Sequence, residues 1–450
     1  MIRNQTRILG GACLPALITL LLCLPSTGFA LCGDVTGDGF VFASDALAAL
    51  KKAVAGQYDD RGDNSAQHEP DGRLSASDAL GILLAAVTDT IPRCAAFKDR
   101  FVAVATASSR FDAAGVAVVD LATRAVQFRP GVLHRDSVVR KLGTEPVFLN
   151  RFGANSVQRL DLDDPALPTV KQCSLSDGFN SNPHDIARVG NKAYATLYDG
   201  AELLVLDVAV LQSGLSVSCD GLILERIDLS SLADEDGLPE MDQMAVVGNR
   251  LYVSLQMLDH TGFFLPAAPG RLAVIDVETD KIVGSIDLEL ENPFLETKGL
   301  IVEPRSGLLY IGGPGKVFVD QSDGGVELVD LQAGASLGVL IDGSALGGDL
   351  FDLAVVGSSR AYGIVAGADS RSRVVEIDLK QGRVSAELLS SAEAITDIEL
   401  TEAGELWVSF RENSKPVTAG LRVFNIANNV ELTKDPIFPG ALPFTLSFGR

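Results

Sequence analysis

Aromatic side chains are scarce in this chain of 450 residues: they make up 6% of it, and Trp407 is the only tryptophan. A sugar-binding groove normally offers several aromatic platforms, so the composition argues against one. Basic residues are also too few to balance the acidic ones, 37 against 59, which leaves a formal net charge of −22. Such an acidic chain is a poor candidate for binding nucleic acid or anionic lipid, whereas its charge favours solubility and attracts cations.

Apolar runs of membrane length are missing, and the one long run lies at the N-terminus. Arg3 and Arg7 precede the apolar segment Leu14–Leu24, and Gly28-Phe29-Ala30 offers small residues at positions −3 and −1 of a cleavage site. This pattern predicts a signal peptide over residues 1–30 and a secreted, periplasmic or cell-surface protein without a membrane span. A lipid anchor on Cys32 is the alternative, and Leu31 disfavours it because a small residue normally precedes such a cysteine.

Cysteine is also rare, with six in the chain and two of them, Cys13 and Cys23, in the predicted signal. An even number of four remains in an exported protein, which favours disulfides over free thiols. Their positions suggest Cys32–Cys94 and Cys173–Cys219. No close C-x-x-C pair supports a structural zinc site.

Enzyme signatures are missing as well. The chain has neither a G-x-S-x-G nucleophile elbow nor an H-E-x-x-H motif. A single tryptophan disfavours the Trp-rich blades of quinoprotein dehydrogenases, and the S-x-D-x-G-x-T-W box of sialidases does not occur. The sequence therefore leans away from an enzyme.

Two copies of a helical pattern lie in residues 31–97. Ala43–Leu47 matches Ala76–Leu80, and each copy has apolar residues at helical spacing. These residues are Leu47, Leu50 and Val54 in the first copy and Leu80, Leu83 and Val87 in the second. Since so short a helix cannot bury its apolar face alone, we expect the copies to pack on each other.

An acidic loop precedes the first helix and fits a twelve-residue calcium loop. Asp34, Thr36 and Asp38 occupy positions 1, 3 and 5, Phe40 would supply its carbonyl, and Asp45 closes the shell at position 12. Ca²⁺ prefers six to eight oxygens, which alternate acidic positions on a tight turn provide. The sequence therefore predicts a Ca²⁺ site, with an ion-free Asp/Gly-rich turn as the alternative.

The loop before the second helix is a weaker match. Asp71 and Asp78 fill positions 5 and 12, but Gln67 and Glu69 stand at positions 1 and 3. Asp59, Asp60 and Asp63 in the preceding insert are substitutes. Whether this loop binds an ion is left open.

Paired calcium loops that are each followed by a helix resemble a type I dockerin, over residues 32–90. The resemblance implies docking onto a cohesin-like protein, often in polysaccharide breakdown. In that family loop positions 10 and 11 help to choose the partner, and here they are Ala43, Ser44, Ala76 and Ser77. A calcium-stabilised spacer is the alternative.

Residues 98–450 repeat a second pattern, in which an apolar strand, a polar turn and another strand recur. Equivalent apolar residues are separated by 45–58 residues, close to the length of a four-stranded propeller blade. They are Val138, Ile186, Met244, Leu300, Leu353, Ile398 and Leu446. The predicted fold is mainly β: a seven-bladed propeller with a small α-helical calcium-loop module, in which the C-terminal strand completes the first blade.

Most units also carry a hydrophobic–Asp–hydrophobic ending, as in Arg271–Leu288. We interpret this aspartate as a cap for the amides of the following turn. The equivalent residues are Asp120, Asp161, Asp207, Asp276, Asp330, Asp378 and Asn425. The whole pattern resembles the YVTN-type and lactonase-like propellers, a resemblance that implies the fold but no activity.

Polar residues gather where the innermost strands are expected to begin, at the mouth of the central channel. The candidates are Asp136, His184, Asp185, Asp242, Gln243, Lys298, Asp352 and Asp397. Converging carboxylates could bind a cation or polar ligand, or simply satisfy local turns. We therefore expect an exported calcium-binding protein with a docking module and a binding propeller. The alternative is a secreted hydrolase or lyase acting on carbohydrate or lactone at the channel mouth.

Overall fold

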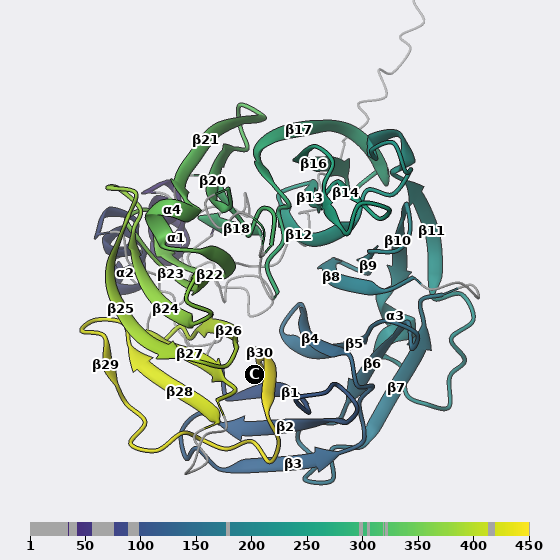
Figure 1. Ribbon diagram of the computed structural model, residues 1–450, viewed down its shortest axis with the longest axis horizontal. Coiled ribbons are helices and arrows are strands. Elements are labelled where there is room, and N and C mark those ends of the chain that lie inside the picture. Colours follow the sequence, from purple (N-terminus) through teal and green to yellow (C-terminus); the bar gives the residue numbers. More distant parts are fainter. Residues whose placement is uncertain are drawn as a thin grey trace, which may run out of the picture.

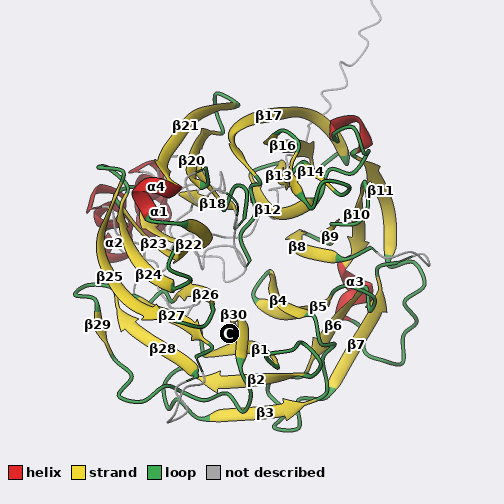
Figure 2. Cartoon of the chain, in the orientation of Figure 1, coloured by secondary structure: helices red, strands yellow, loops and turns green. Residues whose placement is uncertain are grey.

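Seven four-stranded antiparallel sheets form a ring of blades around one axis (Figure 1), as the repeats predict. The structure is a computed structural model that describes Val35 and residues 43–55, 76–88, 99–176, 181–296, 300–303, 307–317, 319, 323–412 and 419–449. Figure 2 shows that strands make up most of the ring and that helices are few and short. Within the described residues, every helix falls short of the length and apolar character of a membrane span.

Each blade has an innermost strand near the axis and three strands outside it. From the inside outward, the blades are β30 (Pro443–Gly449), β1 (Phe101–Ala107), β2 (Ala114–Asp120), β3 (Val126–Pro130); β4 (Ser137–Leu142), β5 (Glu145–Asn150), β6 (Ser156–Leu160), β7 (Thr169–Ser174); β8 (Pro183–Val189), β9 (Lys192–Leu197), β10 (Glu202–Asp207), β11 (Ile223–Asp228); β12 (Met241–Val247), β13 (Arg250–Leu255), β16 (Pro269–Asp276), β17 (Lys281–Glu291); β18 (Leu300–Glu303), β19 (Leu308–Gly313), β20 (Gly325–Asp330), β21 (Ala335–Asp342); β22 (Asp349–Gly357), β23 (Arg360–Ala366), β24 (Ser372–Asp378), β25 (Arg383–Ser391); and β26 (Ile395–Leu400), β27 (Glu405–Phe410), β28 (Gly420–Asn425), β29 (Val430–Glu431).

The remaining elements lie outside this plan. They are the hairpin β14 (Leu258–Asp259) and β15 (Leu265–Pro266), the helices α1 (Ala43–Ala55), α2 (Ala76–Thr88), α3 (Val208–Gln212) and α4 (Gly343–Leu346), and the 3₁₀ turn η3 (Ser230–Leu232).

Burial explains the apolar composition of the inner strands. β1 (FVAVATA) and β30 (PFTLSFG) are buried along almost their whole length, since neighbouring blades cover both faces. The outermost strand β21 (ASLGVLID) instead alternates exposed and half-buried positions along most of its length. The core is consequently divided into clusters that lie mostly between adjacent blades.

The recurring aspartate is a turn cap, as predicted. Asp276 follows the apolar run of β16, and its Oδ1 accepts the N–H groups of Glu278 and Thr279 at 3.2 and 3.0 Å. Equivalent bonds to following amides are made by Asp120, Asp161, Asp207, Asp330, Asp378 and Asn425. The repeated motif is therefore structural.

The two ends of the propeller meet in one blade, where β30 pairs antiparallel with β1 and Leu446 lies opposite Val104. Trp407 fills the seam beside this blade: it is fully buried and meets Phe448 edge-on, with ring centroids 6.1 Å apart. A strand that would otherwise present a free edge is thereby paired.

A disulfide joins Cys173 on β7 to Cys219 in the loop before β11, with their Cα atoms 5.7 Å apart. This is one of the two pairs that the sequence suggests. The other, Cys32–Cys94, lies outside the described residues, as do the calcium-loop residues Asp34, Thr36, Asp38, Phe40 and Asp71.

Helices α1 and α2 pack on each other, but not through the predicted apolar face. Their contact is made by Ala46, Ala49, Ala79 and Ile82. The residues expected in that contact are at least 37% exposed, and Val54 reaches 82%. They are Leu47, Leu50, Val54, Leu80, Leu83 and Val87. Small alanines allow the helix axes to approach closely, and this leaves the larger side chains on the outside.

Candidate functional site at the start of the innermost strands

The innermost strands all begin at the same face of the ring, because each blade repeats the same antiparallel order. Loops from an outermost strand to the next blade, and loops between second and third strands, reach this face too. Asp136, His184 and Asp242 stand at equivalent positions around β4, β8 and β12, three consecutive blades. The predicted channel-mouth residues of these blades are thus brought together.

In several blades the residue that follows this position joins one blade to the next. Asp185 accepts the N–H of Met244 at 2.8 Å, and Asp352 accepts the N–H of Ile398 at 2.8 Å. Asp397 accepts the N–H of Leu446 in the same way. In the closing blade the hydroxyl of Thr445 accepts the N–H of Val139 at 2.9 Å. These side chains have a structural role in the ring, beside any contact with a ligand.

Gln243 occupies the equivalent position on β12 and reaches across to Leu295, whose carbonyl accepts its Nε2–H at 3.3 Å. Lys298 lies outside the described residues. Asp352 and Asp397 belong to the blades of β22 and β26, whereas the cluster around His184 comes from the blades of β4, β8 and β12. The predicted set is therefore split between two parts of the ring.

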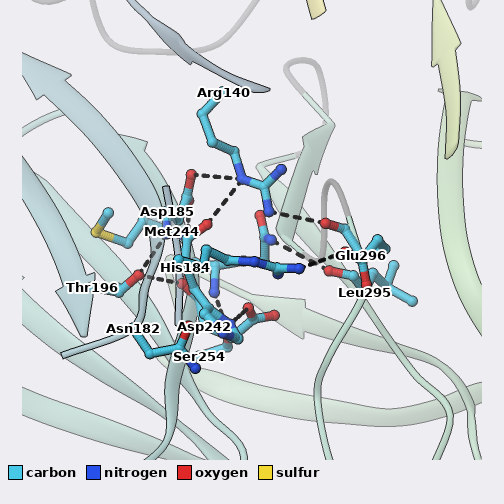
Figure 3. Close-up of polar contacts among 12 residues, drawn as sticks. Arg140, Asn182, His184, Asp185, Thr196, Asp242, Met244, Ser254, Leu295 and Glu296 are labelled. Carbon is cyan, nitrogen blue, oxygen red and sulfur yellow. Dashed lines mark hydrogen bonds and ion pairs between the residues drawn. The ribbon is translucent and has the colours of Figure 1, made fainter. Parts of the chain in front are cut away.

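Two buried arginines hold the cluster together (Figure 3 shows Arg140). Arg140 donates from Nε to the carbonyl of His184 at 3.0 Å and from Nη2 to the carbonyl of Glu296 at 2.9 Å. Its Nε lies 3.6 Å from Asp185. Arg140 therefore ties β4 and β8 to the loop before β18.

Arg151 makes a parallel connection. Its Nη2 lies 2.8 Å from Asp136 and 3.4 Å from Glu296. Both arginines are less than 10% exposed, so their charges need the surrounding carboxylates and carbonyls.

His184 and Asp242 form the innermost pair, with Nδ1 and Oδ1 2.9 Å apart (Figure 3). Burial, with the charges of Arg151 and Arg140, lowers the pKa of His184 well below 6.5. Burial raises the pKa of Asp242 to about 7, against the opposing effect of the same arginines. At neutral pH His184 is therefore uncharged.

Aromatic rings extend the site away from the axis. Tyr198, in the loop after β9, stacks on His184 with ring centroids 4.6 Å apart and 15° between the planes. His260, in the insertion between β13 and β16, lies 6.1 Å from Tyr198 and 4.7 Å from Phe264. Phe263 beside it is 93% exposed. The insertion thus places exposed aromatic surface beside the polar cluster.

Two cavities in the described part of the chain lie away from this cluster. One, of about 480 Å³, is lined by Glu145, Arg159 and Asp163 among others. The second, of about 440 Å³, is lined by residues that include Asp369 and Arg373. Neither is lined by the residues of the His184 cluster.

Comparison with known proteins supports the fold alone. No family model matches the chain, and no curated protein matches its sequence. Among solved structures, it is similar to a putative 6-phosphogluconolactonase from Bacteroides fragilis, with a TM-score of 0.53 and 12% identity over 78% of this chain and 98% of that one. It is also similar to a putative 6-phosphogluconolactonase from Bacteroides uniformis, with a TM-score of 0.52 and 12% identity over 78% of this chain and 100% of that one. For a protein from Lactobacillus plantarum the TM-score is 0.52 and the identity 13%, over 78% of this chain and 100% of that one. The chain is therefore a seven-bladed propeller that resembles the lactonase and YVTN type.

Several members of the site are absent from the sequence-based prediction. Arg140 stands within the apolar pattern of β4, and Arg151, Tyr198 and Glu296 come from connecting segments. Their charged or aromatic character is the only signal in the sequence, and it does not say which loops meet. His260 stands in an insertion that the repeat pattern does not cover.

Proposed function

We propose that this protein is an exported, non-catalytic binding protein. Its N-terminal helix pair binds Ca²⁺ and docks onto a cohesin-like partner, and its propeller binds a ligand or protein at the face where the innermost strands begin.

The observation that carries this proposal is the pair of buried carboxylates on α1 and α2. Asp45 and Asp78 occupy the same place in the first turn of each helix, and both are completely buried. The Oδ1 of Asp45 accepts the N–H of Val35, ten residues earlier in the chain, at 3.0 Å. Carboxylate oxygens are the ligands that Ca²⁺ prefers, and the acidic loops predict one of them at position 12, at the start of each helix.

The outer surface of the helix pair supports docking. The exposed apolar side chains, Leu47, Leu50, Val54, Leu80, Leu83, Leu84 and Val87, cover both helices. The apolar contact between the described helix residues is made by Ala46, Ala49, Ala79 and Ile82, whereas the larger apolar side chains are exposed, as at a surface that meets a partner. Ala43, Ser44, Ala76 and Ser77 begin the same helices, where the dockerin resemblance puts partner choice.

The test uses the full mature chain and a purified type I cohesin. Calorimetric titration should show Ca²⁺ binding that Asp45→Asn weakens, while Asp228→Asn, a change in an exposed residue at the end of β11, leaves it unchanged. Surface plasmon resonance should show cohesin binding in Ca²⁺ that a chelator abolishes. Calcium binding without any cohesin binding would reduce the module to a calcium-stabilised spacer, and no calcium binding would overturn the proposal.

The second candidate function is a secreted hydrolase or lyase acting on a lactone or carbohydrate, and the His184–Asp242 pair favours it. A neutral imidazole held by a carboxylate is suited to general-base catalysis. The low exposure of the pair, 6% for His184 and 1% for Asp242, favours binding over catalysis, because a substrate would have to displace covering groups. Turnover in a screen of lactones and polysaccharides that His184→Ala abolishes would establish the enzyme instead.

A further inference from the structure

A second polar cluster lies beside Tyr198, where the insertion between β13 and β16 meets the loop before β12. One carboxylate oxygen each from Asp236 and Glu240 and one ring nitrogen of His260 lie within 4.8 Å of one another. Asp236 and Glu240 come from the loop between β11 and β12, and His260 comes from the turn between β14 and β15. Two loops that are separate in the sequence therefore bring three potential metal ligands to one point.

The two buried atoms of this cluster have no hydrogen-bond partner. Glu240 is completely buried, and its Oε1 accepts no hydrogen bond. The Nε2 of His260 is equally buried and makes none. The two atoms lie 3.0 Å apart, close enough for an ion pair but without hydrogen-bond geometry. Neither atom has a hydrogen bond that would offset its burial, and two such atoms side by side are the arrangement expected of two ligands of one ion.

That separation suits two ligands of one ion. Donor atoms about 2.0–2.2 Å from a metal lie about 3 Å apart when their bonds meet near a right angle. The other atoms of the cluster are already held in place. Glu240 Oε2 accepts the N–H of Leu258 at 2.9 Å, and Asp236 Oδ1 accepts the N–H of Leu238 at 2.9 Å. Backbone bonds to ligating carboxylates are the usual support of a metal site.

Asp236 and His260 are also tied to each other, since the backbone N–H of His260 donates to Asp236 Oδ2 at 3.3 Å. The imidazole is held between Tyr198 and Phe264. The buried Oδ2 of Asp234, without a hydrogen-bond partner, adds a further acidic group in the same loop. These contacts fix the ligand atoms before any ion arrives.

We propose that Asp236, Glu240 and His260 bind a divalent transition-metal ion of the Zn²⁺ class. A mixed set of one imidazole and two carboxylates favours such an ion over Ca²⁺ or Mg²⁺, which prefer oxygen ligands alone. The ion would fasten the insertion to the β11–β12 loop. Three protein ligands leave at least one coordination position for water or a ligand oxygen. This site is separate from the calcium loops and does not depend on the proposed docking function.

The test is a calorimetric titration of the full mature chain with Zn²⁺, in excess Ca²⁺ so that the calcium loops do not compete. Glu240→Gln and His260→Gln should each weaken binding at least 10-fold, since even the loss of an outer-shell partner costs about 10–100-fold. Glu235→Gln makes the same chemical change at an exposed position of the same loop and should leave binding unchanged.

Co²⁺ supplies a second measurement. The wild-type protein should show a visible absorption band with Co²⁺ that His260→Gln removes, and circular dichroism should confirm that each variant is folded. If His260→Gln does not fold, Glu240→Gln decides the question. The proposal is overturned if the wild type binds no Zn²⁺, or if Glu235→Gln and Glu240→Gln bind it equally.

Discussion

His184 and Asp242 stand at the same position of neighbouring innermost strands, and their Nδ1 and Oδ1 atoms are 2.9 Å apart. Arg140 and Arg151 lie close enough to act on both residues electrostatically, and Arg140 also donates to the His184 carbonyl. The propeller repeat therefore creates the pair by placing residues about one blade apart side by side. Burial sets the direction of both pKa shifts, and the arginines, which the repeat does not predict, modify them.

The first prediction concerns the pH dependence of stability at His184. Its pKa in the folded protein is below the unfolded value of about 6.5, so the unfolded chain binds the extra proton more readily. The stability that a neutral His184 contributes is fully present above about pH 6.5, and it is lost as the pH falls towards the pKa of His184 in the folded protein.

This can be measured with His184→Asn in urea unfolding at a series of pH values. The difference in unfolding free energy between wild type and variant should decrease below pH 6.5, by up to about 1.4 kcal/mol per pH unit. His134→Asn, in the loop before β4, gives the baseline for loss of a histidine. A difference that does not change with pH would contradict the lowered pKa.

The second prediction concerns the side chains that join the blades. Asp352 accepts the backbone N–H groups of Leu353 and Ile398, and all three residues are buried. Asp352→Ala leaves both donors without this acceptor and should lower the free energy of unfolding by about 2–5 kcal/mol. Asp330→Ala, which removes a cap from an exposed turn, should cost about 1 kcal/mol or less. Equal losses would show that Asp352 does not stabilise the contact between blades.

The third prediction concerns the Cys173–Cys219 disulfide, whose cysteines are 46 residues apart in the sequence. Replacing both cysteines by alanine should lower the free energy of unfolding by about 2–5 kcal/mol, since the unfolded chain gains the freedom of an open loop. Reduction of the wild type should bring its urea midpoint to that of the variant. If neither treatment moves the midpoint, the bond is either not formed or not stabilising.

Much of the propeller is predictable from the sequence because each blade repeats the same constraints. Inner strands are apolar throughout since blades cover both faces, and Asp276 and its equivalents mark where third strands end. Periodicity thereby predicts the blade number, and the offset of the repeat predicts that β30 pairs with β1.

The site is less predictable because only part of it follows the repeat. Asp136, His184 and Asp242 follow the repeat and can be identified from it. Glu296 and His260 come from loops, whose meeting depends on tertiary structure. The hydrogen bond from Arg140 on β4 to the carbonyl of His184 on β8 is likewise not predicted by the repeat.

The helices α1 and α2 show a different limit. The spacing of Leu47 and Leu50 identifies an apolar face, but periodicity does not say what covers it. In the structure Ala46 and Ala49 make the helix contact, and the predicted face is exposed. This exposed face is the surface proposed above for docking.

The last prediction separates these two faces. Leu80 is 55% exposed, whereas Ile82, two residues on, is completely buried against α1. Leu80→Ala should weaken binding to a type I cohesin and change stability by no more than about 0.5 kcal/mol, because it removes little buried surface. Ile82→Ala should instead destabilise the helix pair by about 2–5 kcal/mol, because it creates a cavity.

Calcium-dependent helicity and cohesin affinity, measured on the full mature chain, distinguish the two variants. Ile82→Ala should lose helicity and affinity together, and excess Ca²⁺ should restore part of both because metal binding is linked to folding. Leu80→Ala should keep its helicity at every Ca²⁺ concentration while its affinity stays reduced. A variant at Leu80 that binds cohesin as tightly as the wild type would show that the exposed apolar face is not the docking surface.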